Sequence, residues 1–367
     1  MVYNYKHFIP ENTSPRGAKG IGVYDSNGNK LHTVPLGRMT QPTTEKLYSF
    51  GLLADCHLEN YRSDAISSYD KFDNALSVFK EHAAAFCCHC GDLTEYGLWY
   101  PSATYEKSTY DPSSFEEYKR ICEKNSMFVY GCCGNHESYN GYDITKMYND
   151  TYGANPTLVV NNLEKLQEYT GNGLYFAKAQ GNDMFLFLGQ PSGNIPMSDE
   201  ALQWLYENLE ANRNKRCFVF VHPHISNGNP NGMITALNLF NNWGTKKTVF
   251  ENLLRHYKNT IVFHGHTHVV FDCQEADKTT IYTDKDGYKS VSVPSSCKPR
   301  YIVNGTLETN YGESQGALVE VYNGFVVLNG LDLIKNKPIP LGTYKIDTKL
   351  VNIEANTFTD STGTITT

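Results

Sequence analysis

The sequence predicts an α/β fold, in which short buried strands alternate with amphipathic helices. Three observations carry this prediction. The chain has 367 residues, 40% of them hydrophobic, which is enough for a large core. Apolar runs of strand length alternate with segments whose apolar residues recur at helical spacing. Five short motifs rich in Asp, Asn and His each follow an apolar run. We therefore expect the five motifs to meet at one edge of a sheet.

Residues 1–46 precede this pattern and are predicted to form an N-terminal extension. The runs 22–25 and 30–34 flank Asn27-Gly28, a dipeptide typical of a tight hairpin turn. Pro35 and Pro42 then lead into the core. The extension is interpreted as an added β-hairpin rather than a catalytic part.

The elements of the core follow in order. The apolar runs predict strands at 52–54, 86–88, 127–130, 185–188, 218–221 and 261–263. Periodic apolar residues predict helices around 66–79 with Asp64 as the N-cap, at 115–122, around 202–209 and around 250–257. Residues 281–282, 291–293 and 318–327 are interpreted as later strands of a second sheet. The tail from 331 to 367 is predicted to be a C-terminal strand or tail extension, which could pack as an edge hairpin, lie disordered or mediate association.

The five motifs consist of residue types that bind metal ions. They supply two Asp, one Asn and four His as ligands, which fit two divalent cations sharing one carboxylate. In order, they are Asp55-Cys56-His57, Gly91-Asp92, Gly134-Asn135-His136-Glu137, His222 and Gly265-His266-Thr267-His268.

This ordered set resembles the calcineurin-like metallophosphoesterases, whose pattern is D-x-H, G-D, G-N-H-D/E, H and G-H-x-H. The resemblance covers about residues 47–330 and implies a four-layer α/β/β/α sandwich with two mixed β-sheets. It places a binuclear metal site at the carboxyl ends of the strands, with Mn, Fe or Zn as divalent or trivalent ions. The first metal would be held by Asp55, His57, Asp92 and His268. Asp92 would bridge to the second metal, which Asn135, His222 and His266 would complete. His136 would be the general acid beside the leaving group.

The chemistry explains these residue types. Two cations about 3.5–4 Å apart can bind two phosphate oxygens and share a hydroxide that attacks in line. A proton donor beside the leaving oxygen, such as His136, typically adds about 10²–10⁴-fold in rate. The sequence therefore predicts a phosphohydrolase acting on a phosphodiester or phosphomonoester of a small molecule, with the diester turned over at least as well. A nuclease of the same superfamily and a non-catalytic binding or structural appendage of a larger assembly are the alternatives.

Two assignments stay open. Glu95 stands three residues after Asp92, where the resemblance places an Asp that orients the catalytic His. It is either that orienting acid, one methylene longer, or a solvated loop acid. His222 is followed directly by Pro223 and then by His224, so either histidine could be the single ligand. His222 is preferred because it keeps the position at the strand end. Glu137 is expected to form supporting hydrogen bonds.

Composition narrows the class of partner. A formal net charge of −7, without any run of Lys or Arg, disfavours a long nucleic acid as the partner. No stretch approaches a membrane span, and the N-terminus lacks the apolar core of a signal peptide, which predicts a cytoplasmic protein. The ten Cys are accordingly expected to be reduced, with Cys87 and Cys90 on opposite faces of a strand. The aromatic-rich loop 96–112 could cover the leaving group or simply pin itself to the surface.

Overall fold

The computed structural model describes residues 45–59, 66–95, 112–137, 167–190, 197–225, 243, 246–271, 288–303 and 306–366, and the backbone of short strands elsewhere. The chain divides into two compact units, Met1–Glu45 and Lys46–Thr367. In the first unit, β1 (Phe8–Glu11), β2 (Gly20–Tyr24) and β3 (Lys30–Pro35) form an antiparallel sheet. The pairing of β2 with β3 around Asn27-Gly28 is the hairpin that the turn signal predicts.

The second unit is built on two mixed six-stranded sheets. One sheet has the order β19-β18-β17-β4-β5-β8, and its strands β4, β5 and β8 are parallel. The six strands of this sheet are β4 (Tyr48–Leu53), β5 (Cys87–His89), β8 (Val129–Gly131), β17 (Gln315–Tyr322), β18 (Phe325–Asp332) and β19 (Lys337–Asp347). The other sheet has the order β13-β14-β12-β11-β10-β9, and its four inner strands are parallel. The six strands of this sheet are β9 (Tyr175–Gln180), β10 (Asp183–Leu188), β11 (Cys217–Val221), β12 (Thr260–His264), β13 (Ile281–Thr283) and β14 (Lys289–Ser292).

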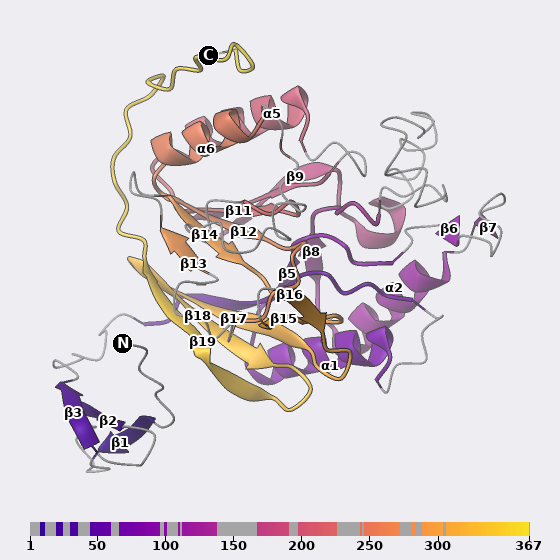
Figure 1. The fold of residues 1–367 in the computed structure, drawn as a ribbon. Coiled ribbons are helices and arrows are strands. Elements are labelled where there is room, and N and C mark those ends of the chain that lie inside the picture. Colours follow the sequence, from indigo (N-terminus) through magenta and orange to yellow (C-terminus); the bar gives the residue numbers. More distant parts are fainter. Residues whose placement is uncertain are drawn as a thin grey trace. The chain divides into compact units, whose positions relative to one another are not determined.

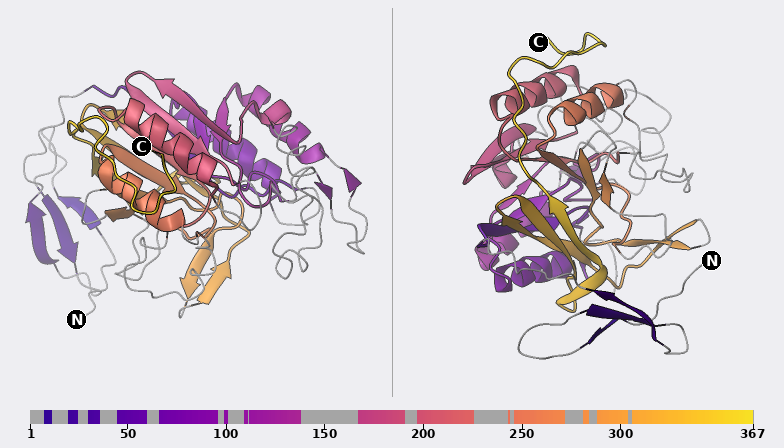
Figure 2. Two further views of the ribbon diagram at one scale, coloured as in Figure 1. Left: turned by 90° about the horizontal axis from the view of Figure 1, so that it is seen from above. Right: turned by 90° about the vertical axis from the view of Figure 1, so that its left-hand side faces the viewer.

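Helices cover the outer faces of both sheets and give the four layers (Figure 1). One sheet is covered by α1 (Ser68–Glu81) and α2 (Ser113–Asn125), and the other by α5 (Asp199–Ala211) and α6 (Lys246–His256). The right-hand view of Figure 2 places the helix pairs on opposite sides of the stacked sheets. The α/β/β/α sandwich expected from the sequence is confirmed.

Alternation along the strands builds three apolar layers. On β11, Phe218 and Phe220 pack between the sheets, whereas Val219 and Val221 pack against α5 and α6. Because side chains alternate across a strand, a strand buried on both faces reads as an unbroken apolar run. The same alternation sends Cys87 toward the helices and Cys90 between the sheets, as predicted. All cysteines among the described residues are free thiols.

Three details of the sequence interpretation need correction. The late strands do not form one second sheet, because β14 pairs with β12 while β17 pairs with β4. The N-cap of α1 is Ser67, whose side chain accepts from the backbone N–H of Asp70 at 3.1 Å, whereas Asp64 lies outside the described residues. The division after residue 330 does not coincide with an edge of the fold, since β18 and β19 pair across it.

The C-terminal tail is packed on the fold rather than loose. After β19 it runs toward α5 and α6 (Figures 1 and 2), where Ile353, Phe358 and Ile365 are buried in the core beneath it. Asn259 donates a side-chain hydrogen bond to the carbonyl of Val351 at 2.9 Å and accepts one from its backbone N–H at 2.9 Å. Among the described residues, no helix combines the length and apolar character needed to cross a bilayer.

Candidate metal centre

All predicted ligands follow the carboxyl ends of parallel strands. Asp55 and His57 follow β4, Asp92 follows β5 and Asn135 follows β8 in one sheet, while His222 and the pair His266 and His268 follow β11 and β12 in the other. The backbone is left-handed at five of these residues, with φ of 52° at Asp55, 45° at His57, 56° at Asp92, 73° at His266 and 62° at His268. A left-handed backbone is unfavourable for these residue types, so the surrounding structure must enforce it. Residues held in this way are common at functional sites.

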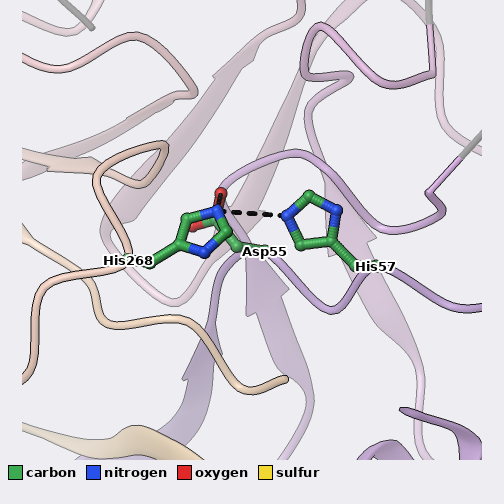
Figure 3. A group of neighbouring side chains, drawn as sticks. All are labelled: Asp55, His57 and His268. Carbon is green, nitrogen blue, oxygen red and sulfur yellow. Dashed lines mark hydrogen bonds and ion pairs between the residues drawn. The ribbon is translucent and has the colours of Figure 1, made fainter. Parts of the chain in front are cut away.

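The first ligand group consists of Asp55, His57 and His268. Their candidate ligand atoms all lie within 4.8 Å of one another. Figure 3 shows the rings of His57 and His268 facing each other beside Asp55. His268 Nε2 lies 3.1 Å from His57 Nε2 and 3.2 Å from Asp55 Oδ1. The three donor atoms therefore surround one point, as the first predicted metal position requires.

The second group consists of Asp92, His222 and His266, again within 4.8 Å of one another. His222 Nε2 lies 3.1 Å from Asp92 Oδ2 and 2.9 Å from His266 Nδ1. Asn135 Oδ1 lies 3.0 Å from the same nitrogen. Asp92 Oδ2 is also 3.9 Å from His57 Nε2, so this one oxygen lies between the two groups, where a shared ligand would have to be.

Hydrogen bonds fix which ring nitrogens carry lone pairs. A carbonyl oxygen only accepts, so His268 Nδ1 must donate to the carbonyl of Lys298 at 3.1 Å, and His222 Nδ1 to that of Cys90 at 2.8 Å. In the neutral rings, Nε2 of each then presents a lone pair to the groups described above. With the rings neutral, nitrogen lone pairs and carboxylate oxygens would lie about 3 Å apart, and a proton or a cation would be needed between them. The donor set fits cations that accept mixed nitrogen and oxygen ligands.

The electrostatics of the metal-free protein agree with this reading. Burial, together with the Lys298 charge, lowers the pKa of His57 to about 3, and burial also lowers the pKa of His266 and of His268. These rings are therefore neutral, the form that binds metal. Burial also disfavours charge on His222, but the Asp92 carboxylate outweighs it and raises the pKa of His222 to about 9. A proton thus offsets the Asp92 charge here, and a bound cation would take over that role.

His136 stands at the more exposed side of the centre. Its side chain is 19% exposed, compared with 1% for Asp92, and its Nε2 lies 3.7 Å from Asp92 Oδ2. Its Nδ1 donates to the backbone carbonyl of Glu95 at 2.6 Å. The ring also falls in a group with His57 and Asp92 whose ligand atoms lie within 4.8 Å.

The expected role of Glu95 needs correction. Its backbone carbonyl, rather than its carboxylate, accepts from His136, while its carboxylate oxygen Oε2 lies 2.7 Å from His57 Nδ1. Glu95 is buried, so the reading as a solvated loop acid is wrong as well. Burial opposes charge on Glu95, but its contacts with His57 and with Lys298 outweigh burial and lower its pKa. The carboxylate is therefore ionised and directed at a predicted ligand.

Glu137 joins the loops that carry Asp92 and Asn135. Its carboxylate accepts from the backbone N–H of Asp92 at 2.9 Å, of Thr94 at 2.8 Å and of Gly134 at 2.7 Å. A Cβ added at Gly134 would lie 2.1 Å from Asp92 Oδ1, so only glycine fits there. These contacts agree with the supporting role expected of Glu137.

The structure distinguishes the two histidines after β11. His222 reaches Asp92 and Asn135, as described above. His224 instead packs its ring against that of His264, with centroids 5.0 Å apart, and its backbone carbonyl accepts from Trp243 Nε1 at 2.8 Å. The preference for His222 agrees with this geometry. The proposed cover by loop 96–112 lies outside the described residues, apart from the backbone pairing of β6 (Trp99–Tyr100) with β7 (Thr109–Tyr110).

One charged residue of the site escaped the sequence interpretation. Lys298 is 6% exposed, and its ammonium contacts Glu95 Oε2. Lys298 lies outside the five ligand motifs and 203 positions from Glu95, so no local pattern marks it. The available signal was topological: β14 is parallel to β12, so the loop after β14 arrives at the same sheet edge.

Comparisons with known proteins point to one family. The family model described as calcineurin-like phosphoesterase matches residues 48–270. A purple acid phosphatase from yellow lupin (Lupinus luteus) seeds has a similar structure, with TM-score 0.53 and 12% identity, over 93% of this chain and 62% of that one. A predicted phosphoesterase from Streptococcus pneumoniae TIGR4 has TM-score 0.36 and 11% identity, over 82% and 97% of the two chains. Vacuolar Protein Sorting 29 from Cryptosporidium parvum has TM-score 0.37 and 12% identity, over 83% and 100%. None of the curated proteins compared with this chain matches it.

Proposed function

The chain belongs to the calcineurin-like phosphoesterase family, and we propose that it hydrolyses a phosphoester of a small molecule at a binuclear metal centre. The observation that carries this proposal is the convergence of candidate ligand atoms described above. His57 Nε2 and His268 Nε2 face each other at 3.1 Å, and His222 Nε2 lies 2.9 Å from His266 Nδ1. Two such points, with an oxygen of Asp92 between them, fit a pair of cations that share one ligand.

The roles follow the two groups. One ion would be held by Asp55, His57, Asp92 and His268, and the other by Asp92, Asn135, His222 and His266. Bound cations supply positive charge that stabilises the phosphoryl oxygens and activates water as the nucleophile. The protein holds its ligands rigidly through backbone contacts. The N–H of His266 donates to both carboxylate oxygens of Asp55, at 3.1 and 3.0 Å, and that of His136 donates to Asp92 Oδ1 at 2.9 Å.

We assign the general acid to His136. Because Nδ1 donates to the carbonyl of Glu95, the other ring nitrogen, Nε2, is the one that faces Asp92 and the centre. A protonated ring in this orientation would deliver its proton from Nε2 to the leaving oxygen. Its partial exposure leaves room for a leaving group beside it.

Two features of the site bear on whether the substrate is a phosphodiester or a phosphomonoester. Proton donation by His136 favours a diester, whose alkoxide is a poor leaving group. The Lys298 ammonium, which contacts Glu95 beside the ligands, would in turn favour the second negative charge of a monoester. The proposal therefore covers both esters of a small molecule. The net charge of −7 continues to disfavour a nuclease.

A metal-reconstitution screen tests the proposal. We expect metal-stripped protein to hydrolyse bis-aryl or mono-aryl phosphates only after Mn, Fe, Zn or Mg is added, with both esters assayed in parallel. Protein that binds two ions per chain yet turns over neither ester would favour the non-catalytic alternative. A chain that saturates with a single ion would contradict the binuclear centre.

Replacing His136 with alanine separates the acid from the ligands. We expect kcat to fall by roughly 10²–10⁴-fold, while the metal content measured by elemental analysis stays at the wild-type level. His224→Ala provides the matched control, because His224 follows β11 and packs its ring against His264. Loss of one ion from His136→Ala would instead show that the third group, with His57 and Asp92, is a real metal position.

A further inference from the structure

Lys298 is linked to both histidines of the first ligand group, directly to His268 and through Glu95 to His57. Its backbone carbonyl accepts from His268 Nδ1 at 3.1 Å. Its ammonium contacts Glu95 Oε2, and that same oxygen lies 2.7 Å from His57 Nδ1. The two imidazoles that it reaches then face each other through their Nε2 atoms at 3.1 Å.

The path through Glu95 determines the tautomer of His57. An ionised carboxylate 2.7 Å from Nδ1 attracts a proton to that atom, so it favours the neutral tautomer that is protonated on Nδ1. The lone pair then resides on Nε2, which points toward His268 and, at 3.9 Å, toward Asp92 Oδ2. Carboxylates that hold the far nitrogen of a metal-binding imidazole orient the ring and raise its basicity.

A buried carboxylate needs a counter-charge. Glu95 and Lys298 are 7% and 6% exposed, so either charge left alone would be costly. Asp55 and Asp92 already place two buried carboxylates at the centre. The Lys298 ammonium allows Glu95 to remain ionised and turned toward His57 without adding net negative charge.

Other contacts fix the loop that carries Lys298. Ser295 Oγ accepts from the backbone N–H of Lys298 at 2.7 Å and donates to the carbonyl of Asp55 at 2.7 Å. Lys71 on α1 donates from Nζ to the carbonyls of Cys297 at 2.8 Å and Tyr311 at 2.5 Å. The loop is therefore anchored independently of the Lys298 side chain.

We propose that Lys298 is a positioning residue of the metal centre: its ammonium holds Glu95 against His57 Nδ1, so that His57 presents Nε2 to the first metal. This inference rests on the proposed function, since it explains how His57 is oriented as a ligand of the proposed metal centre. It assigns Glu95 to His57 rather than to His136. It also predicts that the Lys298 side chain affects one metal position and not the other.

Metal titration of the folded protein tests the inference without relying on turnover. Metal-stripped wild type and Lys298→Met are titrated with Co²⁺, with binding followed by calorimetry and by the visible absorption of the ion. We expect Lys298→Met to weaken one of two binding events by about 10–100-fold and to leave the other unchanged. Lys298→Arg should recover part of the loss, because the charge returns.

Two further variants distinguish positioning from general damage. Lys124→Met removes a lysine whose ammonium contacts Asp73, away from the loop that carries Lys298. Its affinities for both ions should match the wild type. Glu95→Gln should weaken the same event as Lys298→Met, and the double variant should be no weaker than Glu95→Gln alone. Equal losses in Lys124→Met, or additive losses in the double variant, would overturn the inference.

The tautomer offers a readout that needs no metal. Long-range ¹H–¹⁵N spectra of metal-free protein labelled at histidine nitrogen should show His57 protonated at Nδ1 in the wild type. Glu95→Gln should shift that signature, and it carries the test if Lys298→Met fails to fold. Unchanged spectra would contradict the proposed path.

Wild-type protein that binds fewer than two Co²⁺ ions would count against the proposed function. Two wild-type affinities retained in Lys298→Met would remove only the role of Lys298.

Discussion

Asp92→Asn is expected to abolish the function of the centre more completely than any other single ligand change. Its Oδ2 atom lies 3.1 Å from His222 Nε2 and 3.9 Å from His57 Nε2, so it adjoins both proposed metal positions. The amide keeps the shape but loses the negative charge that offsets the cations. We expect the metal content to fall from two ions to one or none, and kcat/KM to fall by roughly 10³-fold or more.

The measurement pairs elemental analysis with hydrolysis of an aryl phosphate at saturating metal. Asp199→Asn is the matched control, because Asp199 is an exposed carboxylate in the first turn of α5. Thermal unfolding adds a second readout. Wild type should gain stability on metal addition, since the metal binds the folded state, while Asp92→Asn should gain much less. Full metal content in Asp92→Asn would show that the two positions do not share this ligand.

The positions of the ligands were predictable because they depend on strand ends. An unbroken apolar run marks a strand buried on both faces, and a parallel strand delivers the next residues to one edge. Asp55 after β4 and His222 after β11 follow this rule although they belong to different sheets. The apolar runs do not show to which of the two sheets each strand belongs. The strands β14 and β17 read alike in the sequence, yet they join different sheets.

Contacts between side chains far apart in sequence were not predictable. Lys298 and Glu95 are separated by 203 positions, and no periodicity links them. The partners of Glu95 were not predictable either: its carboxylate lies beside His57, while its backbone carbonyl accepts from His136. The β18–β19 pairing agrees with the edge hairpin that was one expectation for the tail, but the packing of the tail after β19 was not predictable. Ile353, Phe358 and Ile365 are buried from a segment without helix or strand, in which apolar residues follow neither helical nor strand spacing.

A buried ion pair at the other end of the strands provides the largest expected effect on stability. Asp183 begins β10 and Arg216 directly precedes β11, so both lie opposite the ends that carry the ligands. Arg216 donates to Asp183 from Nε at 3.1 Å and from Nη2 at 2.6 Å, and Tyr48 on β4 donates to Asp183 Oδ2 at 2.6 Å. Arg216 Nη1 also donates to the carbonyl of Tyr322 on β17 at 2.9 Å. The group therefore joins the two sheets by hydrogen bonds.

Arg216→Met is expected to lower the free energy of unfolding by about 3–5 kcal/mol, because it leaves Asp183 charged, buried and without its cation. Denaturant unfolding of metal-free protein measures this without the stabilisation that metals add.

Arg120→Met, which breaks an exposed ion pair with Glu117, should leave the midpoint near the wild type. The double variant Asp183→Leu with Arg216→Met should be more stable than Arg216→Met alone, since it removes the orphaned carboxylate. Folded Arg216→Met should retain wild-type metal content, because the pair lies at the far end of the strands from the ligands. A midpoint for Arg216→Met equal to that of Arg120→Met would mean that apolar packing alone holds the sheets together.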